Sequence, residues 1–172
     1  MRNPILLAFA SAALLSSCAP TLQANQPAPA PVQASSPACA PVTEAQVAGF
    51  FDRWNAALQT GDPATVASLY RADALLLPTV SNRPRANTDE IQAYFVDFLK
   101  KKPSGKIERR IVRLGCNVAL DGGVYTFTFG KDGSQVTGRY TYVYEFEDGQ
   151  WKIASHHSSA MPQDITAEPW AQ

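Results

Sequence analysis

The sequence lacks a surplus of either charge and has few of the residues that build reactive centres. Its 15 lysines and arginines balance 15 aspartates and glutamates, and no basic run is longer than Lys100–Lys102. Nucleic-acid-binding domains normally carry a basic stripe, so this balance argues against nucleic acid as a partner. Only two histidines are present, the adjacent His156 and His157.

Several catalytic motifs are also missing. The sequence has no G-x-S-x-G nucleophile elbow, no glycine-rich phosphate loop and no His-Arg-Asp kinase motif. Neighbouring residues on a strand point to opposite faces, so His156 and His157 cannot chelate one ion, and no other cluster has ligand spacing. We therefore predict no metal and no cofactor.

The first 18 residues, MRNPILLAFASAALLSSC, have the composition of an export signal. Arg2 precedes an apolar run, residues 5–15, that is too short to span a membrane. Residues 15–18 resemble a bacterial lipobox that would leave Cys18 lipidated, and Ala19 resembles the residue found there in outer-membrane lipoproteins. The sequence predicts an exported outer-membrane lipoprotein facing the periplasm, held to the membrane only by its N-terminal lipid. If the lipobox is false, an ordinary signal peptide would leave a soluble periplasmic or secreted protein.

Residues 19–41 are rich in Pro and Ala and predict a tether, because they cannot bury apolar surface. The globular domain is expected over 42–162, with a C-terminal tail over 163–172. With Cys18 lipidated, Cys39 and Cys116 remain as an even pair in an oxidising compartment, which favours a disulfide between them. The alternative is two unpaired thiols.

Three helix signals occur in the first half of the domain. Thr43 and Gln46 fit a capping box that opens a helix over 43–60. Asp62-Pro63 starts a short second helix, whose buried side is expected to include Leu69 and Tyr70. A strand at 74–77 follows, and a third helix begins at Asn87 or Thr88.

The second half is rich in β signals. Turn residues at 121–123, 131–133 and 147–149 divide it into strands over 106–120, 123–129, 135–146 and 151–159. The order predicts an α+β fold, in which three N-terminal helices pack on a curved antiparallel β-sheet. Such a sheet would wrap the first helix into a cone with a cavity at its wide end.

The segment FDRWNAALQTGDPATVASLYRADALLLP resembles the helix–helix–strand opening of the NTF2-like (SnoaL-like) superfamily. IQAYFVDFLKKKP and DGQWKIASHHSSAMP resemble the association (hub) domain of calcium/calmodulin-dependent protein kinase II. The resemblance covers about residues 43–162 and implies a homodimer or larger homo-oligomer, formed through the exposed sheet face. On that face we expect Arg139, Thr141 and Val143. The fold alone implies no single activity, because it hosts enzymes, binders and assembly modules.

The resemblance also implies a pocket inside the cone. Its expected lining is Trp54, Tyr70, Leu77, Phe129, Tyr142, His156, His157 and Ser158. Arginines that line the hub's pocket align with Phe129, Tyr142 and Ser158 here, which argues against anion binding by the same means. A small apolar or weakly polar ligand is the expected occupant.

Enzyme members of the superfamily supply the alternative, a small lyase or isomerase with a cavity histidine as general acid or base. The carboxylate base of ketosteroid-isomerase-like members aligns with Pro78 here. Dehydratase-like members pair a histidine with an aspartate, and His156 or His157 would be that histidine, without an evident inward acid as its partner. We therefore favour a non-enzymatic protein of the cell envelope.

Alternation leaves open which histidine faces the cavity. His157 shares a strand face with Trp151 and Ile153, which favours a core position for His157. The hub resemblance instead places Ser158, and with it His156, in the pocket.

Overall fold

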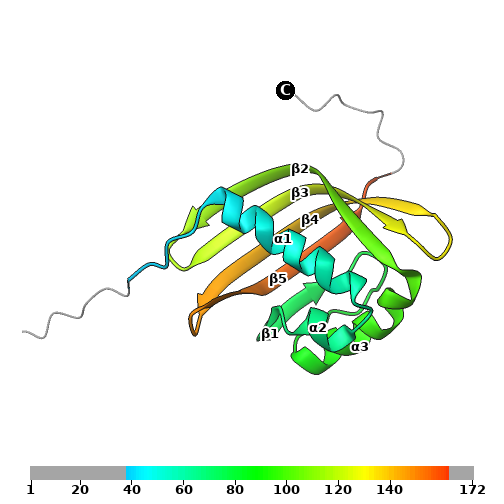
Figure 1. The fold of residues 1–172 in the computed structure, drawn as a ribbon, viewed down its shortest axis with the longest axis horizontal. Helices are drawn as coiled ribbons and strands as arrows, with labels where there is room; N and C mark the ends of the chain where they lie inside the picture. The colour runs from blue at the N-terminus through cyan, green and yellow to red at the C-terminus, as the bar shows by residue number, and fades with distance from the viewer. Residues whose placement is uncertain (1–37, 163–172) are drawn as a thin grey trace, which may run out of the picture. The chain divides into compact units, whose positions relative to one another are not determined.

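The computed structural model describes residues 38–162 as helices packed on one curved sheet (Figure 1). The elements, in chain order, are α1 (Glu44–Gln59), α2 (Pro63–Ala67), β1 (Tyr70–Leu77), α3 (Thr88–Phe98), η1 (Leu99–Lys101), β2 (Pro103–Gly115), β3 (Val118–Phe129), β4 (Gln135–Glu147) and β5 (Gln150–Ala160). This order confirms the predicted α+β class. The expected signal peptide, most of the tether and the tail over 163–172 lie outside the described residues.

The helices begin where the capping residues predict. Thr43 Oγ1 accepts the backbone N–H of Gln46, and the Gln46 side chain accepts the N–H of Thr43, which completes the capping box. Asp62 and Asn87 cap α2 and α3 in the same way, by accepting backbone N–H groups two or three residues ahead. Helix α2 is shorter than expected, and Tyr70 therefore lies in β1.

The strands are arranged in the order β1-β5-β4-β3-β2. Strands β2 to β5 form an antiparallel meander, and β1 is added at one edge, parallel to β5. Helix α1 crosses one face of the sheet (Figure 1). On that inner face Tyr140, Tyr142 and Tyr144 of β4 are buried, and rings of α1 such as Phe51 pack against Tyr140 and Tyr142.

The turn between β2 and β3 lies at Cys116-Asn117, so the turn predicted at residues 121–123 is wrong. Gly115 pairs with Val118 across this two-residue connection, and Asn117 takes the positive φ of 57° that asparagine tolerates. Gly123 instead lies inside β3, where an added Cβ would sit 1.9 Å from the carbonyl oxygen of Arg109. Glycine at this position lets the backbone of β3 lie close to the backbone of β2, where the pairing of β2 is irregular. It does not reverse the direction of the chain.

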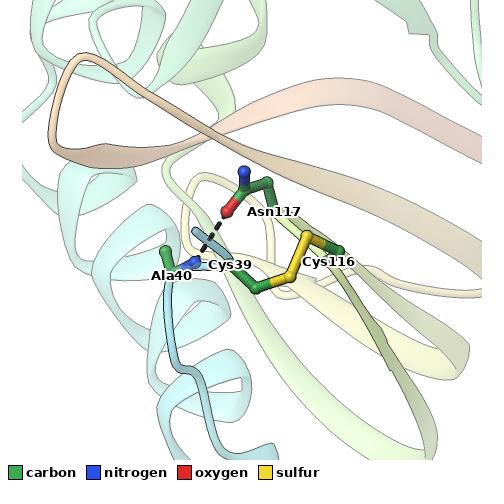
Figure 2. The surroundings of a disulfide bond; sticks show 4 residues. All are labelled: Cys39, Ala40, Cys116 and Asn117. Atoms are coloured by element: carbon green, nitrogen blue, oxygen red, sulfur yellow. Dashed lines mark hydrogen bonds between the residues drawn. A yellow bond between two sulfur atoms is a disulfide. The ribbon is translucent and has the colours of Figure 1, made fainter. Parts of the chain in front are cut away.

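A disulfide joins Cys39 to Cys116 and confirms the predicted pair (Figure 2). Beside it, the backbone N–H of Ala40 donates a hydrogen bond of 2.7 Å to Asn117 Oδ1. The segment that leads into α1 is thus attached to the β2–β3 turn, which lies 77 residues further along the chain.

Candidate cavity site

A cavity of about 350 Å³ lies between α1, α3 and the inner face of the sheet. That volume is within the range of small-molecule pockets in proteins. Most of its wall is apolar or aromatic. The lining residues that matter below are Trp54, Phe98, Phe127, Phe129, His156 and Ser158.

A bulge in β5 decides which histidine faces this cavity. Ile153 pairs with Tyr144 and Ser155 pairs with Val143, so Ala154 is an extra residue without a partner on β4. An extra residue reverses the alternation beyond it. Ile153 and His156 are therefore both buried, while His157 is exposed on the opposite face. The two conflicting expectations came from reading β5 as regular.

His156 is enclosed by aromatic rings and joined to a hydrogen-bond chain. Its ring stacks on Tyr142 with centroids 4.0 Å apart, and Trp54 meets it edge-on at 5.4 Å. Nδ1 lies 2.9 Å from the Tyr70 hydroxyl, which accepts the indole N–H of Trp54 at 3.0 Å. Nε2 has no hydrogen-bond partner among residues 38–162. Burial, with a smaller contribution from the charge of His157, lowers the pKa of His156 to about 3.

The buried neutral imidazole predicts a pH-dependent stability. The unfolded chain binds a proton near pH 6.5, whereas folded His156 binds one only near pH 3. Protons therefore favour the unfolded state, and stability is lost as pH falls through this window. Between pH 7.5 and 4.5, the free energy of unfolding should fall by about 2.5 kcal/mol more in the wild type than in His156→Phe. Urea unfolding of the wild type and of His156→Phe at both pH values measures this difference.

His157→Phe is the matched control, because it changes the neighbouring histidine on the exposed face. It should keep the wild-type pH dependence. Carboxylates contribute equally to all three proteins, so parallel curves for wild type and His156→Phe would contradict a buried neutral His156.

Ser158 lies two residues along β5 and faces the same cavity. Its hydroxyl contacts the buried hydroxyl of Tyr125 and the partly buried hydroxyl of Thr79, which forms a cluster of three hydroxyl groups. Charged side chains stay at the rim, where Lys101, Lys131 and Asp132 are exposed. The cavity thus has a neutral, hydrogen-bonding inner end and a charged opening.

The structure separates the residues expected to line one pocket. Trp54, Phe129, His156 and Ser158 line the cavity. Tyr70 and Tyr142 are buried against His156 but are not among the lining residues. Leu77 and His157 were placed wrongly: they pair with each other across β1 and β5 and border a shallow depression of about 110 Å³ elsewhere.

Sequence reasoning missed Tyr125, Phe127 and Thr79. Tyr125 and Phe127 share the inner face of β3 with Phe129, so strict alternation from Phe129 would have found both. Thr79 follows β1 in an irregular loop and gave no such signal.

The chemistry of the cavity does not include an acid–base pair. The one carboxylate among the described lining residues is Asp132, which sits at the rim and accepts from the backbone and hydroxyl of Ser134. Asp121 is buried on the inner face but accepts from Arg110 and Tyr140 outside the cavity lining. Within residues 38–162, no group of three or more His, Cys, Asp and Glu side chains could hold a metal.

The outer face of the sheet carries Arg139, Thr141 and Val143 at alternate positions of β4. Around them lie apolar side chains that are unusually exposed. Those on the outer face of β1, β2 and β3 are Leu75, Ile111, Val118 and Leu120. We call these four residues, together with Val143, the outer patch.

The family model for the calcium/calmodulin dependent protein kinase II association domain matches residues 43–162. The chain belongs to this family. A solved structure of a candidate association domain of the same family, from Xanthomonas campestris, is 54% identical over 73% of this chain and 96% of its own, with a TM-score of 0.67. No curated protein matches the chain.

More distant structures share the fold of this association domain. An NTF2-like protein of unknown function from Pseudomonas putida KT2440 is 18% identical over 72% of this chain and 89% of its own, with a TM-score of 0.62. A candidate dehydratase of the NTF2-like family from Streptomyces avermitilis is 17% identical over 69% and 95%, with a TM-score of 0.61. These likenesses confirm the NTF2-like architecture. Among residues 38–162, no helix is long and apolar enough to cross a membrane.

Proposed function

We propose that this association domain is a non-enzymatic assembly module of the cell envelope, which binds further copies of itself through the outer patch. The observation that carries the proposal is the exposure of large apolar side chains on the outer face of the sheet. Leu120, near the start of β3 on that face, is 36% exposed, and Ile111 of β2 is 47% exposed. Contiguous exposed apolar surface is typical of interaction sites.

The register of the strands makes the patch continuous. Leu120 pairs with Val143, Val143 with Ser155, and Ser155 with Leu75, so one row crosses β3, β4, β5 and β1. The next row runs from Ile111 through Gly122 and Thr141 to His157 and Leu77. The two rows place Leu120, Val143, Leu75 and Ile111 on one face, which could meet the same face of a second copy about a two-fold axis.

Leu120→Glu tests this proposal. A carboxylate within a self-complementary interface would be desolvated beside its own copy, which is costly for both subunits. We expect the variant to dissociate at least tenfold more readily than wild type, seen as monomers in native mass spectrometry and light scattering at concentrations where wild type is oligomeric.

Val96→Glu is the matched control, because Val96 is also an exposed apolar residue, 45% exposed, but lies on α3 instead of the sheet. It should keep the wild-type subunit number. A monomeric wild type, or equal effects of the two substitutions, would contradict assembly through the outer patch.

We further propose that the protein is exported and anchored through a lipid on Cys18. The Cys39–Cys116 disulfide supports an oxidising compartment, where such bonds persist. Cys18 lies outside the described residues. Cys18→Ala should move the protein from the membrane fraction to the soluble fraction, and a variant that stays with the membrane would contradict lipid anchoring.

A second candidate function is the binding of a small molecule in the cavity. Its support is the open volume of about 350 Å³ beside a largely aromatic wall, which packing of the core has not filled. A lyase or isomerase would also need an acid or base poised near neutral pH. His156, with its lowered pKa and no carboxylate partner in the cavity, does not fit that role well.

A further inference from the structure

The hydrogen-bond chain at the cavity wall fixes the tautomer of His156. The Tyr70 oxygen accepts the Trp54 N–H, and its own proton can go only to His156 Nδ1 among the described groups near it. The opposite tautomer would leave both the Tyr70 proton and the Nε2 lone pair unpaired and buried. The favoured tautomer therefore carries its proton on Nε2.

That Nε2–H is a donor without an acceptor. It has almost no accessible surface and no partner among residues 38–162. Its ring is part of the wall of the cavity, so an acceptor in the cavity reaches Nε2 when that wall shifts slightly outward. Buried polar groups in folded proteins are nearly always paired, so an unpaired donor beside an open cavity points to a missing acceptor. Rotation of the ring cannot relieve it, because Tyr70 holds Nδ1 and Tyr142 stacks on the ring face.

We propose that the cavity selects neutral, ring-containing molecules that bear a hydrogen-bond acceptor, such as a ketone or ester carbonyl, directed to His156 Nε2. This deepens the small-molecule candidate above and rests on it. The aromatic wall favours a flat apolar body. The hydroxyl cluster of Ser158, Tyr125 and Thr79 lies on the same inner side and gives a second polar contact.

Charge at the inner end is disfavoured by the same residues. The polar groups there are a neutral imidazole and three hydroxyls, whereas Lys101 and Lys131 are exposed at the rim. An anion buried beside His156 would lose its hydration without gaining a counter-charge. The expected ligand is therefore neutral, and carboxylates of the same size should bind more weakly.

Three probes of nearly equal shape test the proposal on the purified full chain: ethylbenzene, acetophenone and benzoate. Dissociation constants come from NMR titrations at pH 7 that follow the indole N–H of Trp54, which lines the cavity. One added hydrogen bond should make acetophenone bind about tenfold more tightly than ethylbenzene, equivalent to about 1.4 kcal/mol. Benzoate should bind at least tenfold more weakly than acetophenone.

His156→Phe keeps the stacked ring on Tyr142 and removes the donor, so it should bind acetophenone and ethylbenzene equally. His157→Phe, on the exposed face, should keep the tenfold preference. The wild-type preference tests the proposal even if His156→Phe does not fold, and nitrogen NMR shifts of wild-type His156 should show the proton on Nε2.

The possible failures can be told apart. If the wild type bound acetophenone and ethylbenzene with equal affinity, binding in the cavity would stand, but the proposed hydrogen bond from His156 to the ligand would be contradicted. If benzoate bound most tightly, the proposal that the ligand is neutral would be contradicted, and the lysines at the rim would be the groups that recognise it. If none of the three probes binds, both the small-molecule candidate and the inference fall, while assembly through the outer patch is tested separately by subunit number.

Discussion

Replacing both Cys39 and Cys116 with serine is expected to lower the free energy of unfolding by about 4 kcal/mol. The bridge closes a loop between residues 77 apart, and it restricts the unfolded chain far more than the folded one, in which the two ends already meet. Since small domains are stable by only about 5–15 kcal/mol, this change removes a large part of the total. Urea unfolding of the wild type and the double variant, both without a reducing agent, measures this loss of stability.

A reducing agent provides the control. Dithiothreitol should lower the stability of the wild type to that of the double variant and leave the double variant unchanged. The hydrogen bond from Ala40 to Asn117 remains possible in both, so it does not account for the difference. A loss below about 1 kcal/mol would mean that the unfolded chain is restricted by other means.

Arg110→Met is expected to lower stability by about 3–5 kcal/mol, because it leaves a buried carboxylate without its counter-charge. Asp121 is fully buried and accepts from Arg110 Nε at 3.0 Å and from the Tyr140 hydroxyl at 2.9 Å. Burial raises the pKa of Asp121, against the opposing effect of Tyr140 and Arg110. Methionine keeps most of the apolar contact of the arginine stem but supplies no charge.

Two comparisons separate charge pairing from packing. Arg110→Met combined with Asp121→Leu should recover most of the loss, because replacing both partners leaves no unpaired charge. Arg71→Met should have a much smaller effect: the side chains of Arg71 and Arg110 are 21% and 22% exposed, but Asp73, Glu145 and Glu147 around Arg71 are all substantially hydrated. Equal losses for Arg71→Met and Arg110→Met would contradict the argument.

Local chemistry allowed the helices and the disulfide to be predicted from the sequence. Thr43, Asp62 and Asn87 are side chains that accept backbone N–H groups at helix starts, and that preference depends on only a few neighbouring residues. The Cys39–Cys116 pair followed from counting the thiols of a chain that its first residues predict to be exported. Both inferences needed no knowledge of how distant strands meet.

The features that escaped prediction depend on contacts between strands. Gly122-Gly123 has the composition of a turn, yet Gly123 is required because another backbone lies against it. The same misreading concealed Asp121, whose pairing with Arg110 exists only once β2 and β3 are in register. Likewise, the unpaired Ala154 is a property of the β4–β5 pairing, and no alternation rule applied to β5 alone reveals that it turns His156 inward.

The disulfide also determines how the domain would respond to mechanical load. If tension is applied between the residues before Cys39 and the C-terminal end, the covalent route runs from Cys39 directly through the sulfur atoms to Cys116. Helices α1 to α3 and strands β1 and β2 all lie between those two cysteines in the chain and are bypassed. In the oxidised protein, only the β3–β5 segment can be stretched out, whereas reduction would place the whole domain under the pull.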